Sequence, residues 1–335
     1  MIIDFNLVWA GIIAMIIIIY VVLDGFDLGI GILFPFVRDT NERHILMNSI
    51  APVWDGNETW LVFGGAALYG AFPIAYGVLL PTLYLPIILM LVALILRGVS
   101  FEFRFKAQRS RIVWDIAFFS GSIAAAFLQG AILGTFVGGF ELNHTDLIIT
   151  DHRWLTPFSL MTGLAVVCGY ALLGATWMII KSEGLLQQTM YRYARYLLIG
   201  VAVFMAAVSL WTPFQDPSIF NRWFSLPNFF YLAPLPLITV IAMMITWFSL
   251  VHKTSEHKPF IMSIGLFILG YIGLVISVWP YFIPHELTLW EVAAPANTQK
   301  FILVGTVIIL PLLLGYTWYA YHVFRGKVKA DAGYH

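Results

Sequence analysis

Two stretches, IIAMIIIIYVV at residues 12–22 and PIILMLVALIL at residues 86–96, decide the class of fold. Neither run alternates polar and apolar residues, as the strands of a membrane barrel with a polar lumen would. Hydrophobic residues make up 60% of the 335 residues and charged residues 11%, far from the balance of soluble domains. The sequence therefore predicts an all-α, polytopic integral membrane protein.

Apolar runs long enough to cross a bilayer recur along the whole chain. Pro73 and Pro81 interrupt two of them, so those two runs have the least defined boundaries. We expect about nine transmembrane helices, centred on residues 8–34, 59–78, 80–98, 113–137, 158–180, 195–213, 228–250, 259–282 and 301–324.

A faint internal similarity relates the two halves of the chain. Tyr20-x-x-Leu23 resembles Tyr170-x-x-Leu173, and the helices that carry them would share an orientation. We therefore expect a single membrane domain over residues 1–335 that contains two four-helix units and one further helix. These parts would be residues 1–137, residues 158–282 and an additional C-terminal helix at residues 301–324.

Basic residues gather in alternate connecting segments. Fifteen fall on one side of the expected membrane and three on the other, namely Arg153, Arg222 and Lys300. The positive-inside rule then places the N-terminus outside and the C-terminus in the cytoplasm. The opening MIIDFNLVW has an acid where a signal peptide would have a base, which indicates a retained first helix.

Two carboxylates in LDGFDLG, Asp24 and Asp27, lie where a chain this apolar should have almost none. Burying such a group in a membrane costs several kcal/mol unless it is paired, protonated or hydrated. A spacing of three puts both on one helix face, and Gly25 and Gly29 leave room there for a backbone or for water. The pair is typical of a proton path, or of a structural lock if one carboxylate pairs with an arginine such as Arg43 or Arg97.

The segment WDGNETW at 54–60 opens the second expected helix with two further acids, Asp55 and Glu58. Asp55 or Asn57 could simply cap the helix, and Glu58 could complement its dipole. Two acid clusters at one depth on consecutive helices nevertheless favour a hydrated channel. Trp60 is either an interface anchor or a wall along a path for a small apolar molecule.

Arg97 ends the third apolar run and is a candidate charge partner for one of the four acids. The following FEFRFK at 101–106 alternates aromatic and charged residues. That pattern favours an interfacial segment whose charges are solvated.

The sequence offers little with which to hold a redox centre. Nearly all eight histidines fall in loops or at expected helix ends, whereas haem ligation requires inward-facing residues at mid-helix. Cys168 is alone, which excludes an internal disulfide. CxxCH, GxGxxG, Walker and HExxH motifs are missing, so we expect no metal site and no nucleic-acid partner.

DGFDLGIG at 24–31, NSIAPVWDGNETW at 48–60 and RGVSFEFR at 97–104 resemble subunit II of the cytochrome bd-type quinol oxidases, with the short, cyanide-insensitive branch nearest in length. The resemblance implies a haem-free subunit of a respiratory enzyme that oxidises quinol and reduces dioxygen. Haems of b type, and in some members d type, would sit in a partner subunit I, in a bacterial inner membrane. Proton transfer would fall on Asp24, Asp27, Asp55 and Glu58, and Trp60 would border an oxygen channel. A structural quinone and a small accessory subunit occur in some members, and membrane lipids surround them all.

Two other classes of function fit the same residues. A proton- or cation-coupled secondary transporter would also need intramembrane acids, although transporters usually place them near the midplane on broken helices. A structural scaffold for a membrane partner would need none of their chemistry.

Overall fold

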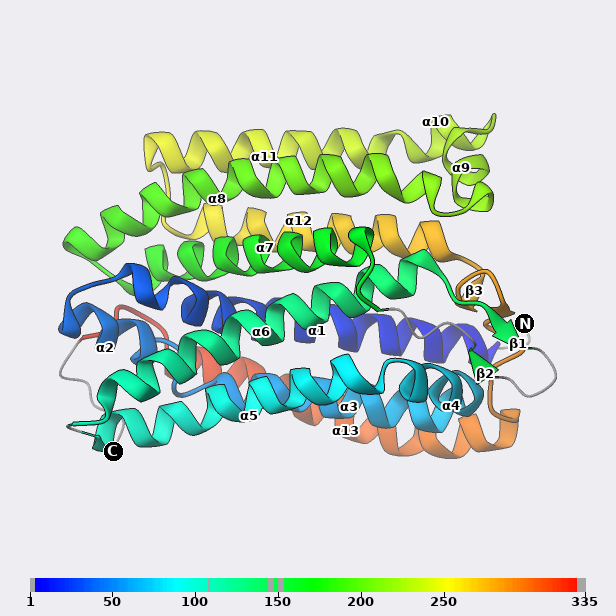
Figure 1. Cartoon of the computed structure of the whole chain (residues 1–335), viewed down its shortest axis with the longest axis horizontal. Helices are drawn as coiled ribbons and strands as arrows, with labels where there is room; N and C mark the ends of the chain where they lie inside the picture. Colours follow the sequence, from blue (N-terminus) through cyan, green and yellow to red (C-terminus); the bar gives the residue numbers. More distant parts are fainter. Residues whose placement is uncertain (1–3, 108, 144–147, 150–153, 330–335) are drawn as a thin grey trace.

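Long helices run side by side along the whole molecule in the computed structural model, which describes residues 4–107, 109–143, 148–149 and 154–329 (Figure 1). Arg153, counted among the basic residues above, lies outside these ranges. Within them, nine helices have 18 residues or more. They are α1 (Phe5–Leu33), α3 (Trp54–Ala71), α5 (Tyr84–Lys106), α6 (Arg111–Gly138), α7 (Pro157–Lys181), α8 (Gly184–Trp211), α11 (Pro234–His252), α12 (His257–Val278) and α13 (Ala296–Val323).

Eight of the nine are long and apolar enough to cross a membrane. The exception is α3, whose first turns carry Asp55 and Glu58. The short apolar helix α4 (Pro73–Thr82) follows it directly, because Phe72 leaves the helical region and Pro73 starts a new helix. The run expected over residues 59–78 is therefore two helices. The prediction of an all-α polytopic membrane protein is confirmed; the division into two four-helix units stays a prediction.

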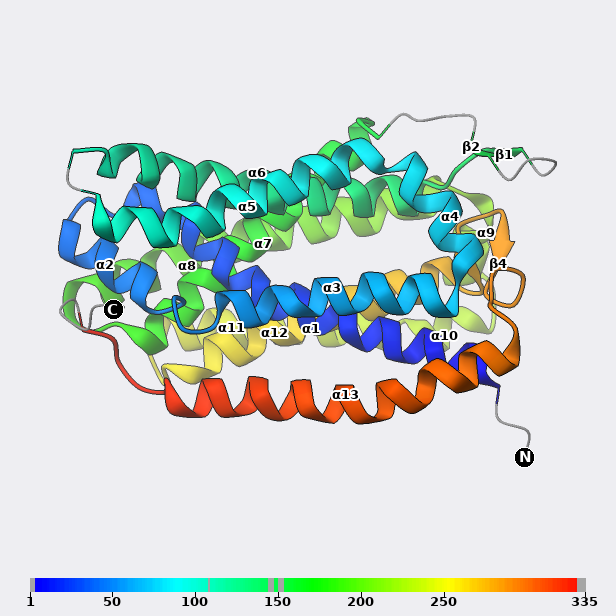
Figure 2. The ribbon, with the colours of Figure 1, turned by 90° about the horizontal axis from the view of Figure 1, so that it is seen from below.

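Short elements close the two ends of the bundle. At one end lie α2 (Thr40–Asn48), the turn between α5 and α6, and the C-terminal end of α13 (Figures 1 and 2). At the other end lie the start of α1 and the remaining short pieces. These are η2 (Thr212–Phe214), α9 (Pro217–Phe224), α10 (Asn228–Leu232) and two small antiparallel hairpins, β1 (Leu142–Asn143) with β2 (Ile148–Ile149) and β3 (Tyr281–Ile283) with β4 (Leu287–Thr288). A 3-10 turn, η1 (Phe34–Phe36), leads from α1 towards α2.

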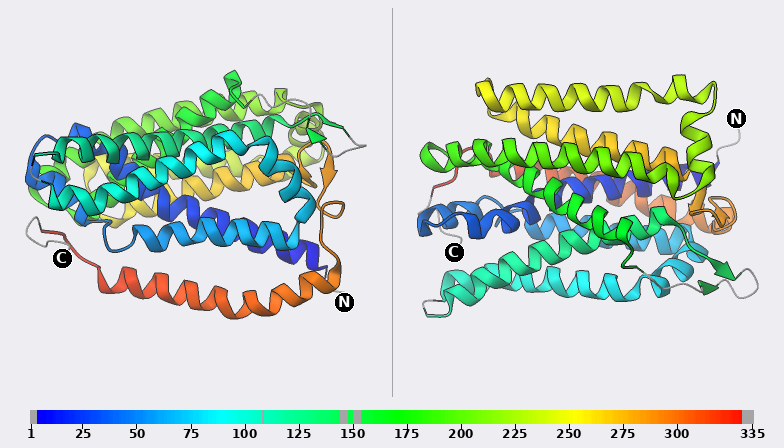
Figure 3. Two further views of the ribbon diagram at one scale, coloured as in Figure 1. Left: turned by 60° about the horizontal axis from the view of Figure 1, so that its bottom comes forward. Right: turned by 45° about the horizontal axis from the view of Figure 1, so that its top comes forward.

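Helix α1 packs against α3, α6 and α7 and forms the centre of the bundle. By contrast, α13 follows one edge, as Figure 3 shows, and contacts mainly α1 and α3. It is fixed at both ends. The Trp9 indole N–H donates to the Gln299 carbonyl (3.2 Å), and the Lys181 ammonium donates to the Phe324 carbonyl (2.7 Å).

Helices α1 and α7 come into backbone contact at Gly29 and Gly174. A Cβ atom at Gly29 would overlap the carbonyl oxygen of Tyr170, and one at Gly174 would meet the backbone of Gly29. Small residues of this kind let membrane helices approach backbone to backbone. The room expected beside Gly29 is thus filled by the α7 backbone.

We predict that Gly29→Ala destabilises the protein by about 1–3 kcal/mol, because the two helices must separate to admit one methyl group. Gly11→Ala is the matched control on the same helix, since a Cβ there meets nothing within 4 Å. Thermal unfolding of the purified protein in detergent measures both. Equal midpoints for the two variants would contradict the role given to this crossing.

Candidate functional site

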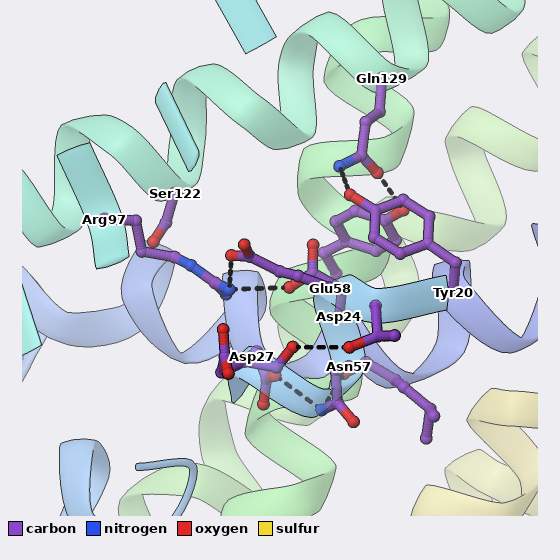
Figure 4. Close-up of polar contacts among 12 residues, drawn as sticks. Tyr20, Asp24, Asp27, Asn57, Glu58, Arg97, Ser122 and Gln129 are labelled. Carbon is purple, nitrogen blue, oxygen red and sulfur yellow. Dashed lines mark hydrogen bonds and ion pairs between the residues drawn. The ribbon is translucent and has the colours of Figure 1, made fainter. Parts of the chain in front are cut away.

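A cluster of charged and polar side chains lies between α1, α3 and α5 (Figure 4). Helix α1 contributes Asp24 and Asp27, α3 contributes Asn57 and Glu58, and α5 contributes Arg97. The two aspartates share one helix face, as their spacing requires, and both are buried. The structure therefore brings together three of the four acids expected from the sequence, together with Arg97.

Arg97 links two of these acids. Its Nη2 lies 2.5 Å from Glu58 Oε1 and 2.9 Å from Asp24 Oδ1, and its side chain is 0% exposed. The Trp54 ring faces the guanidinium carbon at 5.7 Å and adds a cation–π contact. Of the two arginines expected as partners for Asp24 or Asp27, Arg97 is the one that pairs, because Arg43 lies 2.9 Å from Asp115 instead.

Asp27 has different partners. The Asn57 amide N–H donates to Asp27 Oδ2 at 2.8 Å, and the Tyr321 hydroxyl donates to Asn57 Oδ1 at 3.0 Å. In the described part of the chain, no cation lies within ion-pair distance of Asp27. Tyr321 comes from α13, more than 260 residues along the chain, so sequence reasoning gave no signal for it.

Several buried polar atoms of the cluster make no hydrogen bond within the described residues: Asp24 Oδ2, Asp27 Oδ1, and Arg97 Nε and Nη1. Leaving such an atom unsatisfied costs about 1–3 kcal/mol. Internal water is the usual partner of buried groups of this kind. A cavity of about 10 Å³ beside Asn57 and Tyr321, between α3 and α13, has room for a single water molecule.

A second polar chain begins one helical turn before Asp24. Gln129 donates from Nε2 to the Tyr20 hydroxyl oxygen at 2.8 Å and accepts from the Tyr170 hydroxyl at 2.6 Å. The two tyrosines are those of the internal similarity noted in the sequence. Gln129 was missed as a candidate, although a lone amide in the apolar α6 is the kind of signal that could have found it.

The other two predicted residues lie outside this cluster. Asp55 is exposed in the first turn of α3. Neither Asp55 nor Asn57 caps the helix, because α3 already begins at Trp54 with Val53 as its N-cap. Trp60 is 1% exposed and packs in an apolar cluster that includes Phe72.

The charges of the cluster do not balance. Asp24, Asp27 and Glu58 face one guanidinium group, so two negative charges would stay uncompensated if all three acids were ionised. Uncompensated buried charge costs several kcal/mol per ion. The arrangement therefore favours protons held within the cluster. Elsewhere in the described residues, no three His, Cys, Asp or Glu side chains gather in the manner of a metal site.

Membrane-length helices packed around a buried acid–arginine cluster define a polytopic membrane protein with a charged interior. The chain belongs to the family described as cytochrome bd terminal oxidase subunit II, whose model matches residues 5–324.

Relatives and a solved structure agree with this family. The chain is 28% identical over 333 residues to cytochrome bd ubiquinol oxidase subunit 2 of Bacillus subtilis, with 96% of each chain covered. It is 26% identical over 360 residues to cytochrome bd-I ubiquinol oxidase subunit 2 of Escherichia coli K12, covering 97% of this chain and 95% of that one. Its fold is similar to a chain of the bd oxidase from Geobacillus thermodenitrificans, with a TM-score of 0.79, 18% identity, and 96% and 98% of the two chains covered.

We predict that Arg97→Gln destabilises the protein by about 3–5 kcal/mol, because it leaves the buried Asp24 and the partly buried Glu58 without their cation. Thermal unfolding of the purified protein measures the loss. Lys106→Gln is the control, since the pair of Lys106 with Glu102 is exposed and contributes less than about 1 kcal/mol.

A triple variant, Arg97→Gln with Asp24→Asn and Glu58→Gln, separates charge from packing. It should recover part of the lost stability, because Asp27 is then the only carboxylate of the cluster left without a cation, in place of three. A triple variant no more stable than Arg97→Gln alone would show that the cost is not electrostatic.

Proposed function

We propose that this chain is the haem-free subunit II of a respiratory quinol:oxygen oxidoreductase, in which it supplies part of a proton path from the cytoplasm. The curated relatives, named as subunits of cytochrome bd ubiquinol oxidases, support the enzyme class. The partner would be subunit I, whose haems supply the oxygen chemistry. The single observation that carries the proton role is the cluster in which two carboxylates, Asp24 and Glu58, pair with one arginine, while a third, the buried Asp27, has no cation of the described chain within ion-pair distance.

The orientation follows from the distribution of charge. The end of the molecule that holds α2, the α5–α6 turn and the end of α13 carries most of the basic residues. We propose that this end faces the cytoplasm of a bacterial inner membrane and that α1 begins on the periplasmic side.

Exposure decreases step by step along the acids. Asp55 is exposed, the Glu58 side chain is 25% exposed, that of Asp24 is 2% exposed, and Asp27 is fully buried. In our proposal a proton enters at Asp55, reaches Glu58 one turn along α3, and passes through water around Arg97 to Asp24 and Asp27. Subunit I completes the route to the oxygen site.

This arrangement separates charge without a pump. Protons consumed at the oxygen site come from the cytoplasm, while quinol releases its own protons on the other side. Each elementary charge moved across the membrane corresponds to about 2.3 kcal/mol per 100 mV. The carboxylates therefore need only carry protons through the low-dielectric layer.

We predict that Asp55→Asn slows oxygen consumption by the assembled enzyme by about tenfold, or about 1.4 kcal/mol of barrier, because it removes a titratable group at the entrance of the path. Asp24→Asn should have a similar effect. The haem spectrum of the complex should be unchanged in both. Asp39→Asn is the matched control, because it removes an exposed carboxylate on α2 and keeps an equally good helix cap. Wild-type turnover in the double variant Asp24→Asn with Asp55→Asn would refute the proton path.

Trp60 supports a second part of the proposal, an oxygen channel towards subunit I. Its indole lies in a hydrophobic cluster to which α1, α3 and α4 contribute, and such surroundings suit a small apolar molecule. A structural quinone in this chain and a small accessory subunit stay predictions.

We predict that Trp60→Leu changes the apparent KM for oxygen by at least about threefold, since the substitution alters an apolar wall without adding charge. The apparent KM for quinol should change by less than about threefold. Steady-state oxygen consumption at varied oxygen and at varied quinol separates the two. A larger effect on the quinol side would count against the channel.

A further inference from the structure

A second charged cluster lies at the proposed cytoplasmic end and has no part in the function proposed above. It consists of Arg43 on α2, Arg104 on α5, and Arg111 and Asp115 on α6, and we call it the arginine cluster. Arg43 Nη1 lies 2.9 Å from Asp115 Oδ2, and Arg104 Nε donates to Asp115 Oδ1. The FEFRFK pattern predicted solvated charges here; for Arg104 that prediction is wrong, because the side chain is 1% exposed.

Several buried donors of Arg104 and Arg111 have no partner in the described part of the chain, whereas Arg43 also donates from Nε to the Val37 carbonyl at 2.7 Å. A guanidinium group has five N–H donors. Arg104 uses Nε, while its buried Nη1 and Nη2 have no hydrogen-bond partner within the described residues, and neither does the buried Nε of Arg111. The Phe34 ring faces the guanidinium carbons of Arg43 and Arg104 at 5.2 and 5.1 Å, but such contacts use the ring face and not the N–H edges.

The arginine cluster carries an excess of positive charge. Three guanidinium groups accompany one carboxylate, and no other carboxylate of the described chain lies within 4 Å of them. Burial, together with the nearby Arg104 and Arg111, lowers the pKa of the neighbouring His44. The unused donors and the excess charge both call for an anion, and phosphate oxygens match the planar donor edge of arginine.

An apolar surface adjoins the arginine cluster. Phe103 on α5 and Ile112, Val113 and Ile116 on α6 are all exposed, and the Phe103 ring stacks on Trp114 at 4.8 Å. These residues lie within the first turns of α6 or the last turns of α5, beside the charges. A ligand that fits both surfaces has a phosphate at one end and hydrocarbon chains at the other.

We propose that the arginine cluster binds the phosphate group of an anionic phospholipid, whose acyl chains lie along the exposed apolar face of α5 and α6. Basic pockets between membrane helices on the cytoplasmic side are suited to anionic headgroups. Arg111 is the residue best placed to test this, because it makes no ion pair with Asp115 and its loss leaves the Arg43–Asp115–Arg104 link in place.

The test uses the delipidated, purified complex, to which phosphatidylglycerol or phosphatidylcholine is returned in detergent while native mass spectrometry measures lipid retention. Arg111→Gln should weaken phosphatidylglycerol retention at least about fivefold, the effect of one basic residue at a lipid surface. Lys106→Gln is the matched control, since it removes a charge at the same end that is already paired with Glu102. Thermal unfolding shows that both variants stay folded.

The outcomes divide cleanly. Selective loss of phosphatidylglycerol in Arg111→Gln, with wild-type behaviour in Lys106→Gln, supports the site. Equal retention of phosphatidylcholine, or an Arg111→Gln complex that retains phosphatidylglycerol as the wild type does, overturns it. Inorganic phosphate distinguishes the two sources of the anion: if phosphate alone raises the melting temperature of the wild type and not of Arg111→Gln, and lipid adds nothing, the site binds a free anion and the lipid proposal fails.

Discussion

One guanidinium group, that of Arg97, holds three helices in a fixed relation. It pairs with Asp24 of α1 and Glu58 of α3 from its position on α5, and its side chain is fully enclosed. A buried ion pair is not in itself strongly stabilising, because desolvation offsets most of the attraction. The ion pair acts by destabilising other arrangements of the helices. Any shift of register between them would leave a buried charge unpaired, at a cost of several kcal/mol. The register of the first helices thus depends on this contact.

Close packing around α1 complements this electrostatic constraint. Gly29 and Gly174 bring α1 and α7 into backbone contact, a few residues beyond the acids. Tyr170, in the same part of α7, then reaches Gln129, and through it Tyr20. Polar groups from α1, α6 and α7 therefore meet in the apolar interior because glycine removes the side chains that would keep the helices apart. Close helix packing, and not ion pairing, thus brings together the polar side chains of Tyr20, Gln129 and Tyr170 beside the acid cluster.

Much of this was predictable from the sequence, and the limits have a physical origin. Length and hydropathy predict the helices, because a membrane leaves few other ways to satisfy the backbone. Acids in apolar runs predict a functional cluster for the same reason. The sequence does not decide whether Arg43 or Arg97 pairs with an aspartate of α1, because only tertiary packing does. The alternation of aromatic and charged residues predicts a solvated Arg104, yet this residue lies two turns after Arg97 on the inward face of α5. The contribution of Tyr321 depends on the docking of α13, which no local pattern encodes.

The charge balance of the two clusters along α5 distinguishes a purely structural ion pair from a site that binds a ligand. A purely structural ion-pair network needs as many positive as negative groups, because each unbalanced charge adds a desolvation cost without an attraction to offset it. Around Arg97 the acids are in excess, whereas around Arg104 the guanidinium groups are. Both clusters retain buried polar atoms that find no partner among the residues that the structure describes. Opposite imbalances call for opposite ligands: an excess of carboxylates holds protons, and an excess of guanidinium groups holds an anion. In our proposals, the same helix therefore presents, two turns apart, a group that keeps acids in place for proton transfer and a group that offers its donors to phosphate.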